Sequence, residues 1–275
     1  MATTFLFAVG QEKKAYQLFT ANGKRTNYGK MLKTLQDKDI ILFGEFHNNA
    51  ISHWLQLEIT KNIGDKKSIV LGAEMFEADN QVALNKYLAG SISAKGFDSS
   101  ARLWKNYPTD YAPLVDYAKE KKYPFVASNI PRRYASMVSK GGFGALDTLD
   151  AKQKAWMVPL PPMYDSLLPG YQKMLTMMGD HTSPNMPKAQ AIKDATMAHF
   201  ILQHYEIGKP FIHFNGAYHS DNYEGILWYL KQQKPELRYA TISTVSQKDI
   251  NKLLAENKGK ADFIIVVDED MTTTY

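Results

Sequence analysis

The chain has 275 residues, of which 44% are hydrophobic and 22% charged, a composition typical of an ordered globular protein with a sizeable core. It contains no cysteine, which excludes disulfide bonds, thiolate zinc sites and cysteine nucleophiles. The net charge of +5 is spread along the chain in short clusters, which indicates a mildly basic surface suited to an anionic small ligand and predicts no nucleic-acid partner.

The segment TTFLFAVGQEKKAYQ near the start of the chain allows two interpretations. Its short apolar run, small residues and polar continuation are typical of the end of a signal peptide that lacks its basic start. This interpretation predicts an exported protein, periplasmic or associated with the outer membrane. The alternative is that residues 5–9 form a short first strand. No window reaches the roughly 18 apolar residues that a membrane helix needs, so no transmembrane segment is expected.

Apolar runs further along the chain predict six strands, most of them continuous and not alternating, as in strands covered on both faces. The predicted strands are 39–45, 68–76, 123–130, 209–219, 237–244 and 261–270. Helical patterns accompany them at 27–37, 50–63, 111–121, 223–233 and 246–257. The alternation predicts an α/β fold with a doubly wound, mostly parallel sheet flanked by helices.

Two stretches interrupt this rhythm. Residues 131–208 contain no clear strand and are rich in methionine and tyrosine, which predicts a smaller helical insertion domain. The α/β domain is then formed by residues 1–130 and 209–275, with a second helical excursion at residues 80–107. The methionines of the insertion either fill a helical core or form an adaptable apolar bed for a ligand.

Polar side chains gather where the predicted strands end. Because ligands bind beyond the carboxyl ends of parallel strands, we expect these side chains to line one pocket. The predicted pocket residues are Glu45, His47, His53, Glu74, Asn129 and His219. Asn48 or Asn49 is a natural cap for the helix that follows.

Carboxylates and imidazoles in one pocket suit two kinds of chemistry. A metal-dependent or acid–base hydrolase would use Glu45, His47, Glu74 and His219. The same groups also suit a structural remnant of an ancestral active site, which holds loops together without catalysis. The residues alone therefore leave open whether the chain is an enzyme.

Five segments resemble the ChaN-like cofacial haem-binding uptake family, within the Tiki/TraB/erythromycin-esterase superfamily. They read LFGEFHNNAISHWLQ, VLGAEMFEADNQ, VASNIPRR, FNGAYHSDNYEGILWYL and ADFIIVV. They occur in the same order, and the resemblance covers about residues 27–267. The resemblance implies an α/β protein of bacterial iron uptake that binds haem and is exported. It also implies a homodimer around two stacked haems, each iron bound by a tyrosine, and an outer-membrane haem receptor as a further partner.

The resemblance favours haem binding over catalysis, and the residues of this sequence supply the candidate contacts. Tyrosine ligation suits ferric haem. Tyr164 is the predicted iron ligand, with Tyr171, Tyr107 and Tyr111 as alternatives. The remaining predicted haem contacts are His181, Arg132 and Arg133, the arginines pairing with propionates. One position departs from the family pattern: Asp221 lies where a basic residue is expected after His219.

Overall fold

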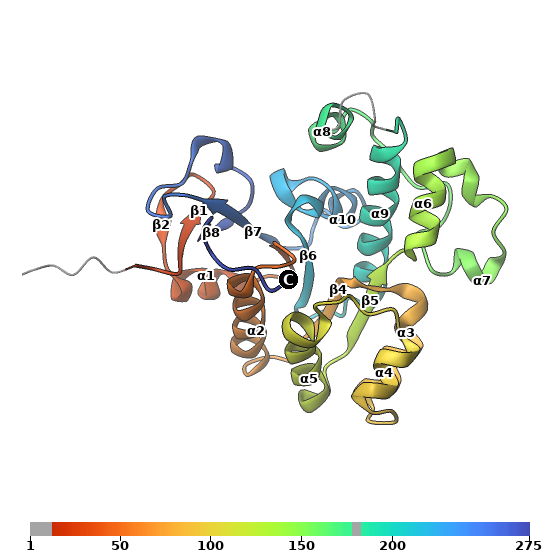
Figure 1. The fold of residues 1–275 in the computed structure, drawn as a ribbon, viewed down its shortest axis with the longest axis horizontal. Coiled ribbons are helices and arrows are strands. Elements are labelled where there is room, and N and C mark those ends of the chain that lie inside the picture. Colours follow the sequence, from red (N-terminus) through yellow and green to blue (C-terminus); the bar gives the residue numbers. More distant parts are fainter. Residues whose placement is uncertain (1–12, 178–182) are drawn as a thin grey trace, which may run out of the picture.

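A mixed sheet forms the centre of the computed structural model, which describes residues 13–177 and 183–275 (Figure 1). Within these residues eight strands lie in the order β2-β1-β8-β7-β3-β6-β4-β5. The strands are β1 Tyr16–Thr20, β2 Arg25–Thr26, β3 Ile40–Glu45, β4 Val70–Glu77, β5 Phe125–Asn129, β6 Phe211–Gly216, β7 Tyr239–Gln247 and β8 Phe263–Asp268. The six strands from β8 to β5 are parallel, whereas β1 and β2 form an antiparallel edge. The predicted α/β fold with a mostly parallel sheet is confirmed; the β1–β2 hairpin was not predicted.

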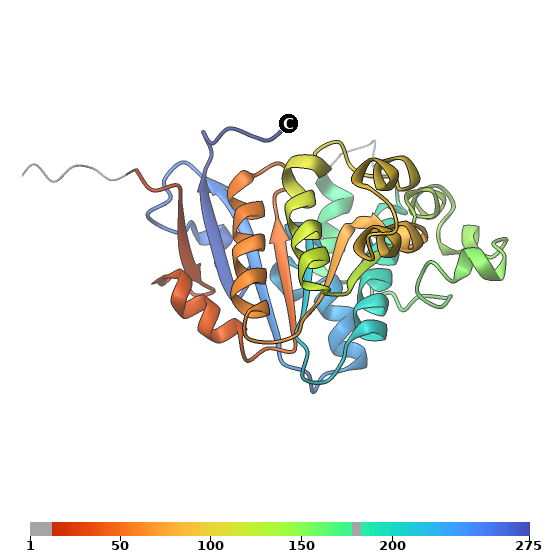
Figure 2. The same cartoon turned by 90° about the horizontal axis from the view of Figure 1, so that it is seen from below.

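Helices cover both faces of this sheet (Figures 1 and 2). The helices are α1 Tyr28–Leu35, α2 Ala50–Gly64, α3 Gln81–Leu88, α4 Ala94–Ser100, α5 Ala112–Lys121, α6 Arg132–Gly141, α7 Ala151–Lys154, α8 Pro169–Met177, α9 Met186–His204 and α10 Ile226–Gln233. In β3, Ile41 and Phe43 face the layer of α1, α2 and α5. Ile40 and Leu42 face α9 and α10. Burial on both faces explains why β3 reads as an unbroken apolar run.

The helix predicted over residues 246–257 is absent, which corrects the expectation from the sequence. Strand β7 continues to Gln247, and the rest is irregular apart from one short turn at Ala255–Asn257. The Gln247 side chain donates to the carbonyl oxygens of Asp249 (3.0 Å) and Lys252 (2.9 Å), so it replaces the helical hydrogen bonds. Ile250 and Leu253, whose spacing suggested a helix, instead pack against the sheet beside Val245.

Residues 131–208 contain helices α6 to α9 where the structure describes them, with an irregular stretch over residues 155–168. Helix α6 packs Tyr134 and Val138 against Ile192 of α9. The same helix α9 also packs Ala198 and Ile201 against the sheet. Helix α9 therefore links the helical segment to the core of the sheet. The division into an α/β domain and a helical insertion domain at residue 131 stays a prediction. The interpretations of residues 5–9 and of His181 lie outside the described residues.

Candidate functional site

The sheet has a topological switch point between β3 and β6. These strands are parallel neighbours, but β3 is followed by α2 on one face and β6 by α10 on the other. Chains that leave neighbouring strands toward opposite faces open a crevice at the carboxyl ends of those strands. The residues just after β3 and β6 include His47 and His219, so the fold itself places both histidines at this crevice.

The first group in the crevice is the pair Glu45 and His47. Glu45 is buried at the end of β3, and its Oε1 lies 2.9 Å from Nδ1 of His47. Tyr111 donates to the same oxygen at 2.6 Å, and Gln56 donates to the other. The His47 side chain is 34% exposed and packs edge-on against Trp104.

These contacts orient the His47 ring and influence how readily it takes up a proton. Burial alone would favour the neutral ring, but the hydrogen bond to Glu45 and the carboxylate of Glu74 raise the pKa of His47 above its ordinary value. Nε2 of His47 has no hydrogen-bond partner among the residues that the structure describes. The imidazole therefore keeps one nitrogen free to meet a ligand.

The second group is a buried imidazole between two carboxylates. Nε2 of His219 lies 3.1 Å from Glu74, and Nδ1 lies 2.5 Å from Asp194 of α9. Burial alone would lower the pKa of His219, but Glu74 and Asp194 raise it to about 10. Burial opposes ionisation of Glu74 as well, yet His219 holds the pKa of this carboxyl well below its ordinary value. Each ring nitrogen thus faces a carboxyl group, which favours the positively charged form of His219. Burial nevertheless raises the pKa of Asp194 above its ordinary value.

The two groups meet at Gly216, the last residue of β6. Its backbone N–H donates to Glu74 at 2.7 Å. A Cβ atom at this position would lie 2.8 Å from Nε2 of His47, so only glycine leaves room for the imidazole. In residues 13–177 and 183–275 no three His, Asp or Glu side chains are arranged to hold a metal ion.

Two adjoining cavities form a cleft over these groups. The first has a volume of about 470 Å³ and lies among Tyr171, Lys173, Asp221, Glu224 and Lys260. The second, about 530 Å³, is lined by residues that include His47, His219 and Tyr275. Gln190 and Tyr218 line both cavities. Each volume lies within the range of roughly 300–1,000 Å³ that small-molecule sites occupy. We call the two together the switch-point cleft.

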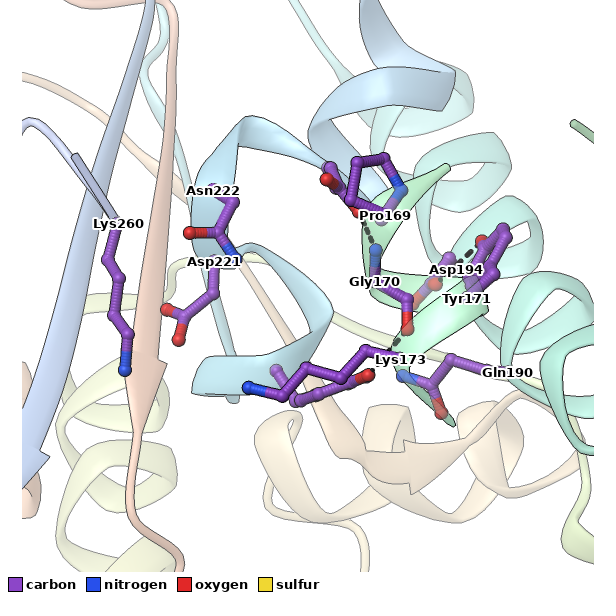
Figure 3. A pocket seen from close by; sticks show the side chains of 12 residues that line it. Pro169, Gly170, Tyr171, Lys173, Gln190, Asp194, Asp221, Asn222 and Lys260 are labelled. Atoms are coloured by element: carbon purple, nitrogen blue, oxygen red, sulfur yellow. Dashed lines mark hydrogen bonds between the residues drawn. The ribbon is translucent and has the colours of Figure 1, made fainter. Parts of the chain in front are cut away.

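Charged groups line the first cavity. Figure 3 shows Lys260 beside Asp221 at one end, and Tyr171 with Asp194 at the other. Burial raises the pKa of Asp221 to about 6, although a hydrogen bond from Ser243 and the two lysines act against this. This chain has Asp221 where the family pattern has a basic residue, but Lys173 and Lys260 bring two ammonium groups to the same cavity from elsewhere in the chain.

The other predicted pocket residues lie behind the cleft. His53 is buried on α2, with Nε2 3.1 Å from the carbonyl oxygen of His47 and Nδ1 3.2 Å from Gln56. Asn129 donates to the carbonyl oxygen of Glu74 at 3.0 Å. Both side chains support residues of the cleft, and neither lines its two cavities.

The predicted tyrosines differ in how free their phenols are. The phenol of Tyr171 is buried and donates to Asp194 at 3.0 Å, and that of Tyr111 donates to Glu45. Tyr107 packs in an aromatic cluster with Phe76 and Phe97. Tyr164 is half-buried and stacks on Tyr171, at the flank of the cleft.

The predicted arginines do not line either cavity of the cleft. Arg133 pairs with Asp79 at 2.8 Å and lies over the rings of Tyr134 and Trp156. Arg132 is exposed on α6. Of the methionines in the helical segment, Met157 and Met197 are buried in the core, whereas Met163 is exposed.

Tyr218 was not predicted as a site residue; it is 40% exposed and lines both cavities. Its phenol donates to the carbonyl oxygen of Gly170 at 2.7 Å. Tyr218 stands between Gly216 and His219 in the motif itself, so its position was a usable signal. Lys173, Asp194 and Lys260 had no such local signal, because α8, α9 and the loop before β8 bring them in from distant parts of the chain.

The family model described as "Haem-binding uptake, Tiki superfamily, ChaN" matches residues 31–230. No curated protein sequence matches the chain.

Solved structures share the fold. ChaN of Campylobacter jejuni, whose structure is described as showing cofacial haem binding, is 17% identical with a TM-score of 0.70; the match covers 94% of this chain and 98% of that one. A Bacillus cereus protein is 11% identical with a TM-score of 0.54, covering 87% and 90%. The type III effector HopBA1 is 13% identical with a TM-score of 0.52, covering 88% and 92%.

Proposed function

The chain belongs to the haem-binding uptake family of the Tiki superfamily, and from that premise we propose that it binds haem as its cargo in the switch-point cleft. The observation that carries the proposal is the cleft itself, which places a half-exposed phenol at the junction of two cavities and two ammonium groups along one of them. A phenolate is a ligand for ferric haem iron, and ammonium groups pair with propionates.

Tyr218 is the iron ligand that the geometry favours. It lines both cavities and its phenol donates only to a backbone carbonyl oxygen, whereas Tyr171 and Tyr111 each donate to a buried carboxylate. Burial and nearby carboxylates raise the pKa of Tyr218, so iron must displace its proton. Tyr164, the ligand predicted from its place in the helical segment, stays as the second candidate because the residue is only half-buried.

The propionates belong with Lys173 and Lys260. Both lysines line the first cavity, and neither makes an ion pair with the carboxylates of that cavity within 4.0 Å among the described residues. Arg132 and Arg133 remain possible contacts only for a ligand that extends beyond the cleft toward α6. His47 offers a free ring nitrogen at the opposite end.

A second copy of the chain completes this proposal. Met163, Leu167 and Leu175 are exposed along the segment that leads into and through α8, beside the cleft. An apolar surface next to a ligand site suits a partner that covers both. The proposed role therefore includes homodimerisation on haem binding. It also includes export to the periplasm or outer membrane, where the chain would exchange haem with an outer-membrane haem receptor. Among the described residues no helix is both long and apolar enough to cross a membrane.

Titration with hemin tests the proposed ligand. We expect the intact protein to shift the Soret band, and Tyr218→Phe to remove the phenolate-to-iron charge-transfer band. Tyr117→Phe is the control, because Tyr117 lies on α5 away from both cavities. A spectrum unchanged in Tyr218→Phe but lost in Tyr164→Phe would move the ligand to Tyr164. A spectrum unchanged in both variants would refute tyrosine ligation in this cleft.

An acid–base hydrolase is the second candidate function. The observation in its favour is His47, which Glu45 orients and which keeps Nε2 free at the second cavity. In this role His47 would act as the general base and Glu45 would hold its ring. Hydrolysis of 4-nitrophenyl butyrate by intact protein, lost in His47→Ala and kept in His204→Ala, would support catalysis. No turnover above buffer would count against it.

A further inference from the structure

Helix α8 forms one wall of the first cavity, and little of it is buried. Within residues 169–176 Tyr171 alone is buried, whereas residues such as Lys173 and Leu175 are exposed. An element that buries few apolar groups can detach locally at a small cost in free energy. The position of α8 against the cleft therefore depends on the hydrogen bonds that hold it there.

Three side chains from other parts of the cleft supply these bonds, and all three meet the first turn of α8 (Figure 3). The N–H of Gly170 donates to Glu224 at 2.7 Å, and the carbonyl oxygen of Gly170 accepts from the Tyr218 phenol at 2.7 Å. The next residue, Tyr171, donates to Asp194 at 3.0 Å. The start of α8 is thus docked on the loop after β6 and on α9.

The bond from Tyr218 uses the same proton that an iron ligand has to give up. A phenol has one O–H donor, and ferric haem iron binds the phenolate, which has no proton left to donate. The hydrogen bond to Gly170 and a bond to iron therefore exclude each other. Tyr218 can hold α8 or bind iron, but it cannot do both at once.

We propose that α8 is a gate over the first cavity, which Tyr218 latches at Gly170 in the ligand-free chain and releases when its phenolate binds iron. This inference rests on the proposed haem site. Lys173 lies one helical turn beyond Gly170, so movement of α8 carries one of the two ammonium groups of the cavity with it. Haem reaches the phenol only when the latch is open, so the closed latch lowers the apparent affinity for haem.

Amide hydrogen exchange of the ligand-free chain tests the latch without any haem. Tyr218→Phe keeps the ring and removes the donor, so we expect exchange at residues 171–177 to quicken about fivefold, the effect of one neutral hydrogen bond. Tyr123→Phe is the matched control, because the Tyr123 phenol donates to the carbonyl oxygen of Gly64 at 2.8 Å, away from the cleft. Exchange at residues 171–177 that is the same in Tyr218→Phe and the intact chain would overturn the latch.

A second variant, Gly170→Ala, loosens the gate and leaves the Tyr218 phenol and every charge in place. A Cβ atom at residue 170 would lie 2.6 Å from Oε2 of Glu224, so this carboxylate has to swing away from the N–H that it holds. We expect faster exchange at residues 171–177 and hemin binding tighter by the same factor, since both measure the open fraction. Gly29→Ala on α1, where the Cβ would lie 3.6 Å from Asn27, should change neither.

The two measurements separate failure of the gate from failure of the haem site. Faster exchange at residues 171–177 in Gly170→Ala without tighter hemin binding would overturn the gate and leave the haem site standing. Unchanged exchange in both Tyr218→Phe and Gly170→Ala, with normal hemin uptake, would do the same. An intact chain that takes up no hemin would overturn the haem site and the gate together.

Discussion

His219 is the residue whose charge matters most for the stability of the site. Its pKa of about 10 in the folded chain lies above its ordinary value of 6.5, so the imidazolium stabilises the fold fully below pH 6.5. That contribution is lost as the pH rises through about 10. The pKa of Glu74 is lowered from 4.5, so its contribution is present above pH 4.5 and is lost at lower pH. The cluster therefore stabilises the protein most between pH 4.5 and 6.5.

We predict that His219→Gln lowers the free energy of unfolding by about 3–5 kcal/mol, because it leaves buried carboxylates without their cation. Urea denaturation at pH 6.5 and at pH 10 measures the effect. The intact protein should lose stability between these values, and the variant should lose much less. His204→Gln, on the exposed end of α9, is the control. An equal loss in His219→Gln and the intact protein would show that another group carries the pH dependence.

Helix α2 begins at a single capping residue, which also fixes the loop that carries His47. Asn49 has extended backbone, and its Oδ1 accepts from the N–H of Ser52 at 3.0 Å. We predict that Asn49→Ala costs about 1 kcal/mol of unfolding free energy. Asn48→Ala should cost much less, because the Asn48 side chain makes no hydrogen bond within the described ranges. Chemical denaturation measures the free energy of unfolding of both variants. An equal decrease in the two would contradict the assignment of Asn49 as the cap.

The segment after β8 crosses to the loop that follows β3. The N–H of Thr274 donates to the carbonyl oxygen of Asn48 at 3.0 Å, and its hydroxyl donates to Asp110. We predict that Thr274→Val weakens the attachment of this segment by about 1 kcal/mol. Amide hydrogen exchange at residues 271–275 should then quicken about fivefold. Thr273→Val is the matched control, since the Thr273 hydroxyl bonds only within the segment. Unchanged exchange in Thr274→Val would mean that the hydroxyl does not hold the segment.

The sequence predicted the elements whose signal is local. Continuous apolar runs such as that of β3 located the parallel strands, because burial on both faces leaves no alternation. The edge strand β1, with its half-buried pattern, carried no such signal. The helix expected over residues 246–257 failed because the Gln247 side chain competes for the backbone hydrogen bonds there. The sequence allowed either Asn48 or Asn49 as the cap, and only the structure distinguishes them.

The site shows the same division between local and distant information. Parallel strands necessarily bring their carboxyl ends to one edge, so Glu45, His47, Glu74 and His219 could be placed together from the sequence. Asp194 joins them from the middle of α9, with no motif around it. The iron ligand was sought in the helical segment because tyrosines are frequent there, and the phenol beside His219 was overlooked.

At the scale of the whole molecule, the basic charge of the protein suits the anionic cargo that we propose. The net charge of +5 favours approach of haem propionates. The two lysines in the first cavity of the cleft would retain them. The chain shares its fold with ChaN of Campylobacter jejuni across 94% of its length. In this fold the switch-point cleft lies at the carboxyl ends of the parallel strands, where α/β proteins bind their ligands.

A crystal structure of the haem-loaded protein, with the iron located by anomalous scattering, tests the central claim most directly. The account predicts iron within coordination distance of the Tyr218 phenol, with the porphyrin across both cavities and its propionates toward Lys173 and Lys260. Iron at Tyr164 would keep the cargo and change the ligand. Iron bound away from the switch-point cleft, or a chain that takes up no haem, would contradict the account.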